Sequence, residues 1–387
     1  MIYSTRMDTG GVASVSALLA NEWLHAGHQV SLVVFENITN DVQVKLDADV
    51  HIYTLNGYKY SKVNVNALRV ILIKEKVDVV INQYGLPWIP MRTLKKAGKG
   101  LQYKVISAYH SDPSANARLT SIDKQLEKQL GLVKRFALKS KRHVASLVTQ
   151  SSMRYVYKHS DAYVLLSESF FKKFSAFTKI NNPQKLFAIP NPVTLESCEV
   201  DKSVKKEKLI IYVGRVDTVV KRVDRVIEVW HLLEDVFPDW RLSIIGDGDG
   251  LEDIKMKVAM YGLKHVSFEG FTNPVDYYRK ASLLMLTSDF EGFGLVLVEG
   301  MSYGVVPVVY GSYDSVFDIV EDSYNGMIAM PDNGVFSTNA MVQIIKTLVL
   351  DEKMLKTLSN NALNVKKKFS KEVILQQWNN VFDYISK

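Results

Sequence analysis

The stretch Glu291-Gly-Phe-Gly-Leu-Val-Leu-Val-Glu299 decides the fold class, because a glycine-rich turn there joins an apolar strand to an apolar helix. Upstream, Ala281 to Ser288 predicts a buried strand, and downstream Leu295 to Tyr303 predicts a helix that packs on a sheet. Val305 to Tyr310 predicts the next strand. This order of strand, helix and strand is typical of an α/β fold with a parallel sheet.

The same turn predicts an anion site. Glycines let a ligand approach the backbone closely, and free N–H groups at a helix start would face a phosphate. Of the two carboxylates, Glu291 precedes the helix and Glu299 lies about one turn inside it. We expect one to hold a ribose hydroxyl and the other a sugar or a developing positive charge, and two solvated glutamates on an ordinary crossover remain the alternative. The binding candidates here are Glu291, Gly292, Phe293, Gly294, Leu295 and Glu299.

The length of 387 residues exceeds what one hydrophobic core usually supports, so two domains are expected. In both halves, apolar strands alternate with helical segments, which predicts parallel sheets covered on both faces. Strands are predicted at 1–4 (a short one), 29–35, 50–55, 77–82, 104–108, 162–167, 185–189, 209–213, 241–245 and 266–268. Helices are predicted at 13–25, 65–76, 222–236, 251–261, 339–350 and 353–368.

Pro190-Asn-Pro192 interrupts the pattern, and the segment that follows is polar and charged. We therefore predict two doubly wound, Rossmann-like domains facing each other across a cleft, where ligands bind at the carboxyl ends of the strands. The predicted boundaries are a first domain at 1–193, a linker at 194–208, a second domain at 209–368, and an amphipathic segment at 369–387 that crosses back to brace the first domain.

Cysteine usage and hydropathy favour a reducing cytoplasm. Cys198 is the one cysteine of the sequence, so no intrachain disulfide can form. The sequence contains no run of about 18 apolar residues, so no membrane span is predicted. The N-terminus lacks the layout of a signal peptide, and its first strand is so short that either the strand is brief or the start was assigned late.

The net charge of +7 points to an anionic partner and is unevenly distributed. The segment from Lys124 to Arg142 contains seven Lys or Arg residues and one acidic residue, Glu127, with apolar residues between them. One or two basic amphipathic helices are predicted, which could rest on the inner face of an anionic membrane or meet a phosphate-bearing acceptor. A solvated helix with its leucines in the core is the alternative. Nucleic acid is not expected, because no recognised binding motif accompanies the charge.

Three further elements follow predicted strands. Gly10 and Gly11 precede a helix and could admit a phosphate or sugar, or form a plain tight turn. Gly214-Arg215 and Lys221 lie before another helix, where the two cations could neutralise a diphosphate and stabilise a leaving group or form surface salt bridges. His110 could form a hydrogen bond with a sugar hydroxyl or with a backbone group of the reacting complex, or be a satisfied structural group.

The loop from Gly246 to Gly250 contains Asp247 and Asp249, a pattern that can hold a divalent cation. A glycine turn with a helix cap explains the loop adequately, so no metal site is expected. The sequence shows neither a Cys/His cluster typical of zinc nor the Ser-His-Asp order of a hydrolase.

These motifs together resemble family 4 of the retaining glycosyltransferases, which have the GT-B architecture. The resemblance covers nearly the whole chain and is most specific from Leu209 to Met330. It rests on Glu291 and Glu299, on Gly214, Arg215 and Lys221, on Gly246 to Gly248, on Phe268 to Phe271, on Gly10 and Gly11, on His110, and on Pro190-Asn191.

The resemblance implies a role for each motif. Glu299 would bind the ribose and Glu291 the donor sugar, while Arg215 and Lys221 would hold the diphosphate. The loop near Phe271 would flank the base, and Gly11 would lie near the sugar and the leaving phosphate. It also implies front-face attack without a metal or other cofactor, a nucleotide-sugar donor for which UDP is the expected nucleotide, and a glycan or lipid-linked acceptor.

The sequence departs from the family pattern in three places. The loop between Arg215 and Lys221 is one residue longer than the commonest form, Arg222 replaces a glycine, and Asp249 replaces a proline. These departures bear on donor identity. The rival hypotheses are a nucleotide-sugar epimerase or hydrolase of the same fold, and a non-catalytic partner of a transferase.

Overall fold

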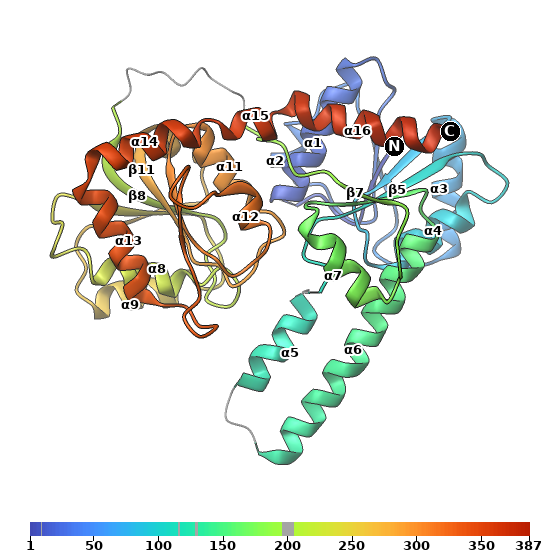
Figure 1. Cartoon of the computed structure of the whole chain (residues 1–387). Helices are drawn as coiled ribbons and strands as arrows, with labels where there is room; N and C mark the ends of the chain where they lie inside the picture. Colours follow the sequence, from blue (N-terminus) through green and yellow to red (C-terminus); the bar gives the residue numbers. More distant parts are fainter. Residues whose placement is uncertain (9, 115–116, 128–130, 196–204) are drawn as a thin grey trace. The chain divides into compact units, whose positions relative to one another are not determined.

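Apolar, β-branched runs form the strands of two all-parallel sheets in the computed structural model, which describes residues 1–8, 10–114, 117–127, 131–195 and 205–387 (Figure 1). The predicted class, α/β with two Rossmann-like sheets, is confirmed. The chain divides into unit 1, Met1–Asn191 with Ile374–Lys387, and unit 2, Pro192–Val373. Cys198 and most of the predicted linker lie outside the described residues.

Unit 1 holds a seven-stranded sheet in the order β3-β2-β1-β4-β5-β6-β7. Its strands are β1 (Ile2–Ser4), β2 (Ser31–Val34), β3 (His51–Thr54), β4 (Val79–Asn82), β5 (Lys104–Tyr109), β6 (Ala162–Leu165) and β7 (Leu186–Ala188). Its helices are α1 (Gly11–His25), α2 (Asn40–Gln43), α3 (Lys62–Lys74), α4 (Trp88–Ala97), α5 (Ala117–Glu127), α6 (Leu132–Lys158), α7 (Ser169–Thr178) and most of α16 (Lys371–Ser386).

Unit 2 holds a six-stranded sheet in the order β10-β9-β8-β11-β12-β13. Its strands are β8 (Glu207–Val213), β9 (Arg241–Ile245), β10 (Val266–Gly270), β11 (Ala281–Leu286), β12 (Val306–Tyr310) and β13 (Met327–Ala329). Its helices are α8 (Val223–His231), α9 (Leu251–Met260), α10 (Val275–Lys280), α11 (Leu295–Ser302), α12 (Val316–Ile319), α13 (Thr338–Leu350), α14 (Glu352–Ala362) and α15 (Val365–Phe369).

Several element predictions need correction. The helix predicted at 353–368 is two helices, because the chain turns at Leu363 and Asn364 between α14 and α15. The helix predicted at 222–236 ends at His231. Strand β8 begins at Glu207, inside the predicted linker 194–208. Helices α4 and α7 and strand β13 were not predicted, and α4 carries Pro90 in its first turn, where a missing N–H costs no helix hydrogen bond.

The basic segment 124–142 forms parts of two helices, α5 and α6, and residues 128–130 lie outside the described ones. The alternative with all its leucines in the core is wrong for part of it. Leu126 and Leu138 pack on a small cluster, whereas Leu132 is 87% exposed.

The C-terminal helix α16 packs on unit 1. The ring of Trp378 packs edge to face on that of Trp23 of α1, with 5.6 Å between ring centroids. The ring of Tyr384 packs in the same way on that of Phe187 of β7, with 4.9 Å between centroids. Aromatic pairs of this geometry add to the stability that their buried area provides. The last residues are therefore part of the fold of unit 1.

The strand order reverses once in each sheet, between β1 and β4 and between β8 and β11. Loops that leave two adjacent strands at such a point run to opposite sides of the sheet, which leaves room for a ligand at the strands' carboxyl ends. The motifs singled out in the sequence lie at the ends of β1, β5, β7, β8, β9, β10 and β11.

Candidate functional site

The turn after β8 lies directly against the turn after β9. The Gly214 N–H donates to the Ile245 carbonyl at 3.0 Å, and a Cβ on Gly246 would lie 1.9 Å from the Gly214 carbonyl oxygen. A Cβ on Gly248 would lie 2.4 Å from the Val216 carbonyl oxygen. Gly246 also has φ 140°, so both space and conformation require glycine.

The same packing engages Asp247 of the loop from Gly246 to Gly250, whose sequence pattern can hold a divalent cation. The Asp247 carbonyl accepts from the Val216 N–H at 2.9 Å, and the Asp247 carboxylate accepts from the Gly248 N–H at 2.7 Å. Within the described ranges, no three His, Cys, Asp or Glu side chains group closely enough to hold a metal ion. The loop thus shapes the turn after β8.

Asp217 organises the loop between β8 and α8. Its Oδ1 accepts the backbone N–H groups of Val219, Val220 and Lys221 at 2.9, 2.6 and 3.0 Å, and its Oδ2 accepts from Arg215 Nε at 2.9 Å. Burial raises the pKa of Asp217, but these hydrogen bonds outweigh burial and leave its pKa below the ordinary value. Asp217 therefore stays ionised and fixes the backbone that presents Lys221.

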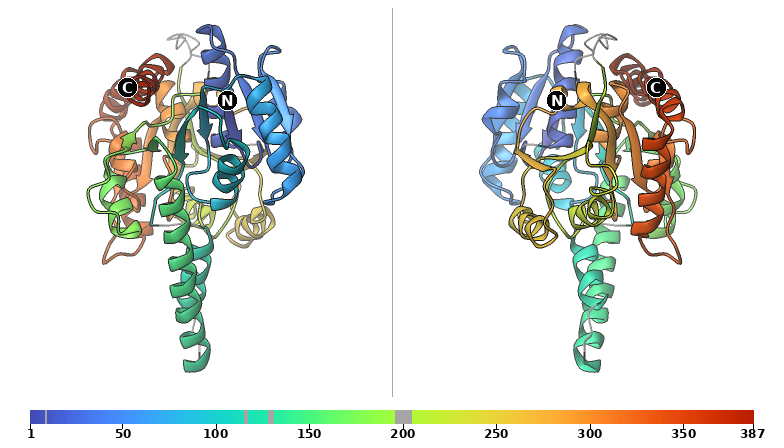
Figure 2. Two further views of the ribbon diagram at one scale, coloured as in Figure 1. Left: turned by 90° about the vertical axis from the view of Figure 1, so that its right-hand side faces the viewer. Right: turned by 90° about the vertical axis from the view of Figure 1, so that its left-hand side faces the viewer.

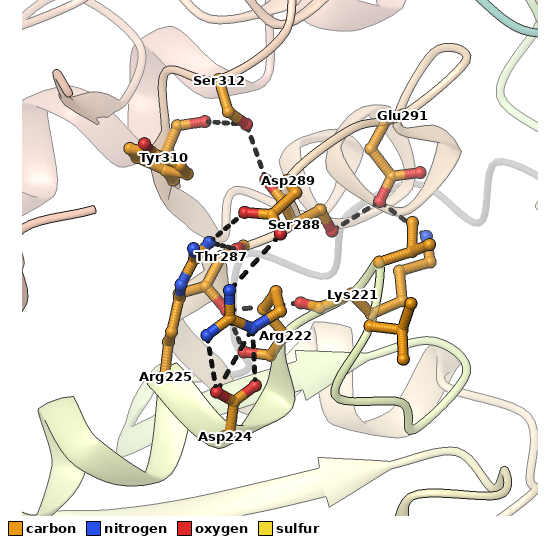
Figure 3. A network of polar contacts seen from close by, with 12 residues as sticks. Lys221, Arg222, Asp224, Arg225, Thr287, Ser288, Asp289, Glu291, Tyr310 and Ser312 are labelled. Carbon is orange, nitrogen blue, oxygen red and sulfur yellow. Dashed lines mark hydrogen bonds and ion pairs between the residues drawn. The ribbon is translucent and has the colours of Figure 1, made fainter. Parts of the chain in front are cut away.

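Lys221 and Glu291 form the closest contact among the predicted site residues. Lys221 Nζ lies 2.6 Å from Glu291 Oε1, which also accepts from the Ser288 hydroxyl at 2.8 Å (Figure 3). The side chains are 21% and 11% exposed. They come from the loops after β8 and β11, the two strands at which the order reverses. The pair thus lies where the topology leaves room for a ligand.

A second ionic network beside this pair was not predicted from the sequence. Arg222 NH2 lies 2.9 Å from Asp224, and Arg222 NH1 lies 3.4 Å from Asp289. The buried Arg225 donates to Asp289 at 2.5 Å and to the Thr287 carbonyl at 3.1 Å (Figure 3). The network ties the start of α8 to the loop that carries Glu291.

Arg222 has φ 53°, the left-handed conformation that glycine adopts without cost. Members of glycosyltransferase family 4 usually have a glycine at this position, because glycine adopts the left-handed conformation without strain. In this chain, the ion pairs to Asp224 and Asp289 hold an arginine there instead.

No side chain in the described part of the chain caps the start of α11. Gly294, with φ 94°, is its N-cap residue. The Tyr313 hydroxyl is buried without a hydrogen-bond partner among the described residues, and a Cβ on Gly294 would lie 3.2 Å from it. Burial raises the pKa of Tyr313, so the group is a neutral hydroxyl beside the uncapped helix start.

The remaining candidates of unit 2 differ in their exposure. Phe271 follows β10 and is 65% exposed, so its ring is available to stack. Phe293 is buried, with its ring 5.4 Å from that of Phe369, so its side chain belongs to the core and only its backbone can meet a ligand. Glu299 is buried in α11 and accepts from the Thr194 hydroxyl at 2.5 Å and the Tyr278 hydroxyl at 3.3 Å.

In unit 1, His110 follows β5 and contacts Gln83, which follows β4. His110 Nε2 lies 2.6 Å from Gln83 Oε1. Because a carbonyl oxygen can only accept, Nε2 carries the proton and Nδ1 is an acceptor. His110 Nδ1 and Gln83 Nε2 are both buried without partners among the described residues. Burial lowers the pKa of His110 to about 4, which keeps it neutral near pH 7.

Gly10 and Gly11 begin α1. Gly10 has φ 153°, makes no side-chain cap, and has nothing within 4 Å of where a Cβ would stand. Thr9, between Asp8 and this turn, lies outside the described residues. Among the described residues, no side chain caps the first N–H groups of α1, and a Cβ on Gly10 would stand in open space.

Two of the unpredicted residues had a signal in the sequence. Gln83 directly follows a predicted strand, at the same sheet edge as His110. Asp217 lies in the predicted anion loop, and aspartate commonly accepts backbone N–H groups two to three residues on. The partners Asp289 and Arg225 are 64 residues apart in the chain and had no such signal.

Comparisons with known proteins bear on the family and the fold of this chain. A model described as Glycosyltransferase Family 4 matches residues 9–197, and one described as Glycosyl transferases group 1 matches residues 196–365. HepE from Anabaena, solved in complex with UDP and glucose, superposes with a TM-score of 0.76 over 99% of this chain and 98% of its own, at 15% identity. The fold and the matched families together define a GT-B glycosyltransferase.

Two curated relatives match along nearly their whole length. An uncharacterized glycosyltransferase of Haemophilus influenzae is 24% identical, with 96% of each chain covered. The other, from Campylobacter jejuni, is 25% identical, with 96% of this chain and 94% of its own covered. It is named GalNAc-alpha-(1->4)-GalNAc-alpha-(1->3)-diNAcBac-PP-undecaprenol alpha-1,4-N-acetyl-D-galactosaminyltransferase. The two models together cover residues 9–365, and with these relatives they show that the chain is a glycosyltransferase.

Proposed function

We propose that this protein is a retaining glycosyltransferase that moves a hexose or N-acetylhexosamine from a UDP-linked donor to a glycan or lipid-linked glycan. The observation that carries the proposal is the contact between Lys221 and Glu291 beside the uncapped start of α11. An ammonium group, a carboxylate and free helix N–H groups are the elements needed to bind a diphosphate and the sugar attached to it.

Binding of a diphosphate would redistribute the charges around Lys221. In the free protein Lys221 is neutralised by Glu291, and Arg215 by Asp217. A diphosphate carries more charge than one carboxylate and would attract the Lys221 ammonium group away from Glu291. The Glu291 carboxylate would then be free to contact the donor sugar, as the family resemblance implies.

Transfer breaks the bond between the sugar's anomeric carbon and the diphosphate oxygen, and it forms a bond from the acceptor oxygen to the same face. The acceptor hydroxyl proton passes to the leaving phosphate, so the products are UDP and the glycosylated acceptor. Lys221 and Arg215 would stabilise the charge that accumulates on the leaving diphosphate, which lowers the barrier more than it strengthens ground-state binding.

Charge stabilisation by these cations would require no metal ion. The Asp247 carboxylate is engaged with the Gly248 N–H, and its loop packs on the turn after β8. Excess chelator is therefore expected to leave the transfer rate unchanged.

In unit 1, the two buried atoms beside β4 and β5 that lack partners among the described residues match a hydroxyl group. Such a group can donate to His110 Nδ1 and accept from Gln83 Nε2, so both buried atoms would be satisfied. A sugar hydroxyl has this chemistry. We assign His110 and Gln83 to hydroxyl recognition, with His110 as a neutral acceptor.

The acceptor assignment follows the name of the Campylobacter jejuni relative, which includes a PP-undecaprenol-linked glycan. An acceptor on a lipid would place the protein at the cytoplasmic face of a membrane. Within the described residues, no helix is long and apolar enough to cross a bilayer.

The proposal is tested by incubating the protein with a panel of UDP-sugars and a lipid-linked glycan extract, and by following the anomeric proton of the product by NMR. Formation of an α-linked product from an α-linked donor supports it. Rapid release of free or epimerised sugar without acceptor would instead establish a hydrolase or epimerase. Binding of donor with no turnover under any acceptor would establish a non-catalytic protein.

A further inference from the structure

Helix α6 has a row of apolar side chains that the fold leaves uncovered. We call this row the outward stripe, and its members are Leu132, Val133, Phe136, Val144, Leu147 and Val148. Their exposed fractions are 87%, 84%, 75%, 57%, 47% and 50%. At 3.6 residues per turn, the row is centred on one side of the helix and continues for more than four turns.

The opposite side of α6 is already occupied. Leu138 and Ala145, which lie on that side, pack with Leu119 and Ile122 of α5. Arg142 pairs with Asp123 of α5, with NH2 at 3.0 Å from Oδ2. Figure 2 shows α5 and α6 extending together from the rest of their unit. The outward stripe is therefore a second apolar face, beyond the one that packing on α5 requires.

The charge of α6 narrows the choice of partner. From Leu132 to Lys158 the helix carries seven Lys or Arg residues and no Asp or Glu. The remaining 41 basic residues of the chain are matched by 41 acidic ones, so α6 accounts for the whole net charge of +7. Lys134 and Lys141 flank the outward stripe on one side and Lys139 on the other.

A second copy of this face would be a poor partner. A two-fold contact between two outward stripes would bring lysines near lysines with no carboxylate on either helix to compensate. An anionic membrane surface offers both properties that are needed, an apolar interior for the stripe and negative headgroups for the flanking lysines.

We propose that the outward stripe of α6 inserts into the headgroup region of an anionic bilayer, with the helix lying along the surface. The stripe runs for roughly 24 Å at 1.5 Å per residue, and its flanking charges exclude a position across the bilayer. This membrane contact is independent of the donor site, so it is measured without substrate and stands or fails separately from the proposed reaction.

The experiment is flotation of the full-length protein with vesicles of phosphatidylcholine mixed with phosphatidylglycerol, and with vesicles of phosphatidylcholine alone. We expect binding to the anionic vesicles that weakens with salt. The double variant Phe136→Ser with Leu147→Ser should lower the partition coefficient at least about tenfold, because two apolar side chains leave the bilayer. Replacing Lys139 and Lys141 by glutamine should lower it about fivefold per charge.

The matched control is Met256→Ser with Met260→Ser on α9, where two exposed apolar side chains of a helix in unit 2 are changed. Its partition coefficient should equal that of the wild type. All the changed residues are solvent-exposed, so the melting temperatures should agree, which shows that a loss of binding is not a loss of fold.

Three results would overturn the proposal. The wild type could fail to float with anionic vesicles, or the Phe136→Ser, Leu147→Ser variant could float as well as the wild type. Sedimentation equilibrium could instead show self-association that this variant abolishes, which would make the stripe an interface between copies of the chain.

Discussion

The candidate binding groups at the strand ends of the two units differ in whether the chain itself supplies their partners. In unit 2, Lys221 and Arg215 are each neutralised by an acid of the chain itself. In unit 1, His110 Nδ1 and Gln83 Nε2 are buried without partners among the described residues. A ligand of Lys221 and Arg215 must therefore displace internal partners, whereas a ligand of His110 and Gln83 would supply missing ones. The difference predicts which variants harm binding and which harm stability.

The largest effect concerns the close packing of the two turns in unit 2. Gly246→Ala would place a Cβ 1.9 Å from the Gly214 carbonyl oxygen, so we expect a loss of about 4 kcal/mol or more in the free energy of unfolding of unit 2. Gly10→Ala in unit 1 has a comparable φ but open space around it, so it should cost only about 1 kcal/mol of conformational strain.

Urea unfolding of both variants measures this contrast. Equal stability losses for Gly246→Ala and Gly10→Ala would contradict the packing that distinguishes the two turns.

The second prediction concerns the cation of the donor site. Lys221→Ala should lower kcat about 10²- to 10³-fold, the loss typical for removal of one preorganised charge-stabilising group. Steady-state transfer kinetics measure it. The matched control is Lys208→Ala, which removes an exposed lysine paired with Asp239 in the same unit and should leave kcat unchanged. An unchanged kcat in Lys221→Ala would remove Lys221 from the mechanism.

The third prediction concerns His110 and pH. Its pKa is about 4 in the folded protein and about 6.5 in the unfolded chain, so the unfolded state binds the proton first as the pH falls. The stability contribution is fully present above pH 6.5 and declines towards pH 4, by on the order of 3 kcal/mol.

His110→Gln should flatten the pH dependence of the unfolding free energy in this window. The control is His28→Gln, at an exposed position of the same unit, which should keep the wild-type slope. Identical slopes for all three proteins would show that His110 is not buried as a neutral group.

The smallest expected effect is at Arg222. Arg222→Gly relieves the left-handed strain of about 1 kcal/mol but loses the ion pairs to Asp224 and Asp289, so the net change in stability should stay below about 1 kcal/mol. Arg222→Lys keeps the strain and loses the planar fork, so it should be less stable than Arg222→Gly. Thermal unfolding ranks the two variants. A more stable Arg222→Lys would show that the positive charge, and not the backbone strain, decides stability at this position.

The sequence predicted the fold well because a parallel α/β fold leaves a strong local signal. The run from Ala281 to Ser288 and the glycine turn after it predict β11 and the start of α11 almost to the residue. It could not predict that Lys221 and Glu291 touch, because they are 70 residues apart and meet only through the pairing of β8 with β11.

The direction in which a side chain points was the other property that the sequence could not predict. Phe293 was predicted at the binding site from its place in the motif, but its ring points into the core against Phe369. In the basic segment, apolar residues occupy two faces of α6, so periodicity alone could not sort the packed Leu138 from the exposed Phe136.

The central claim is that a diphosphate takes Lys221 away from Glu291. Isothermal titration of UDP into the wild type, Lys221→Ala and Lys208→Ala tests it most directly. The account predicts saturable binding to the wild type and to Lys208→Ala, and binding at least about tenfold weaker to Lys221→Ala. Equal affinity of UDP for all three proteins, or no binding to the wild type, would contradict it.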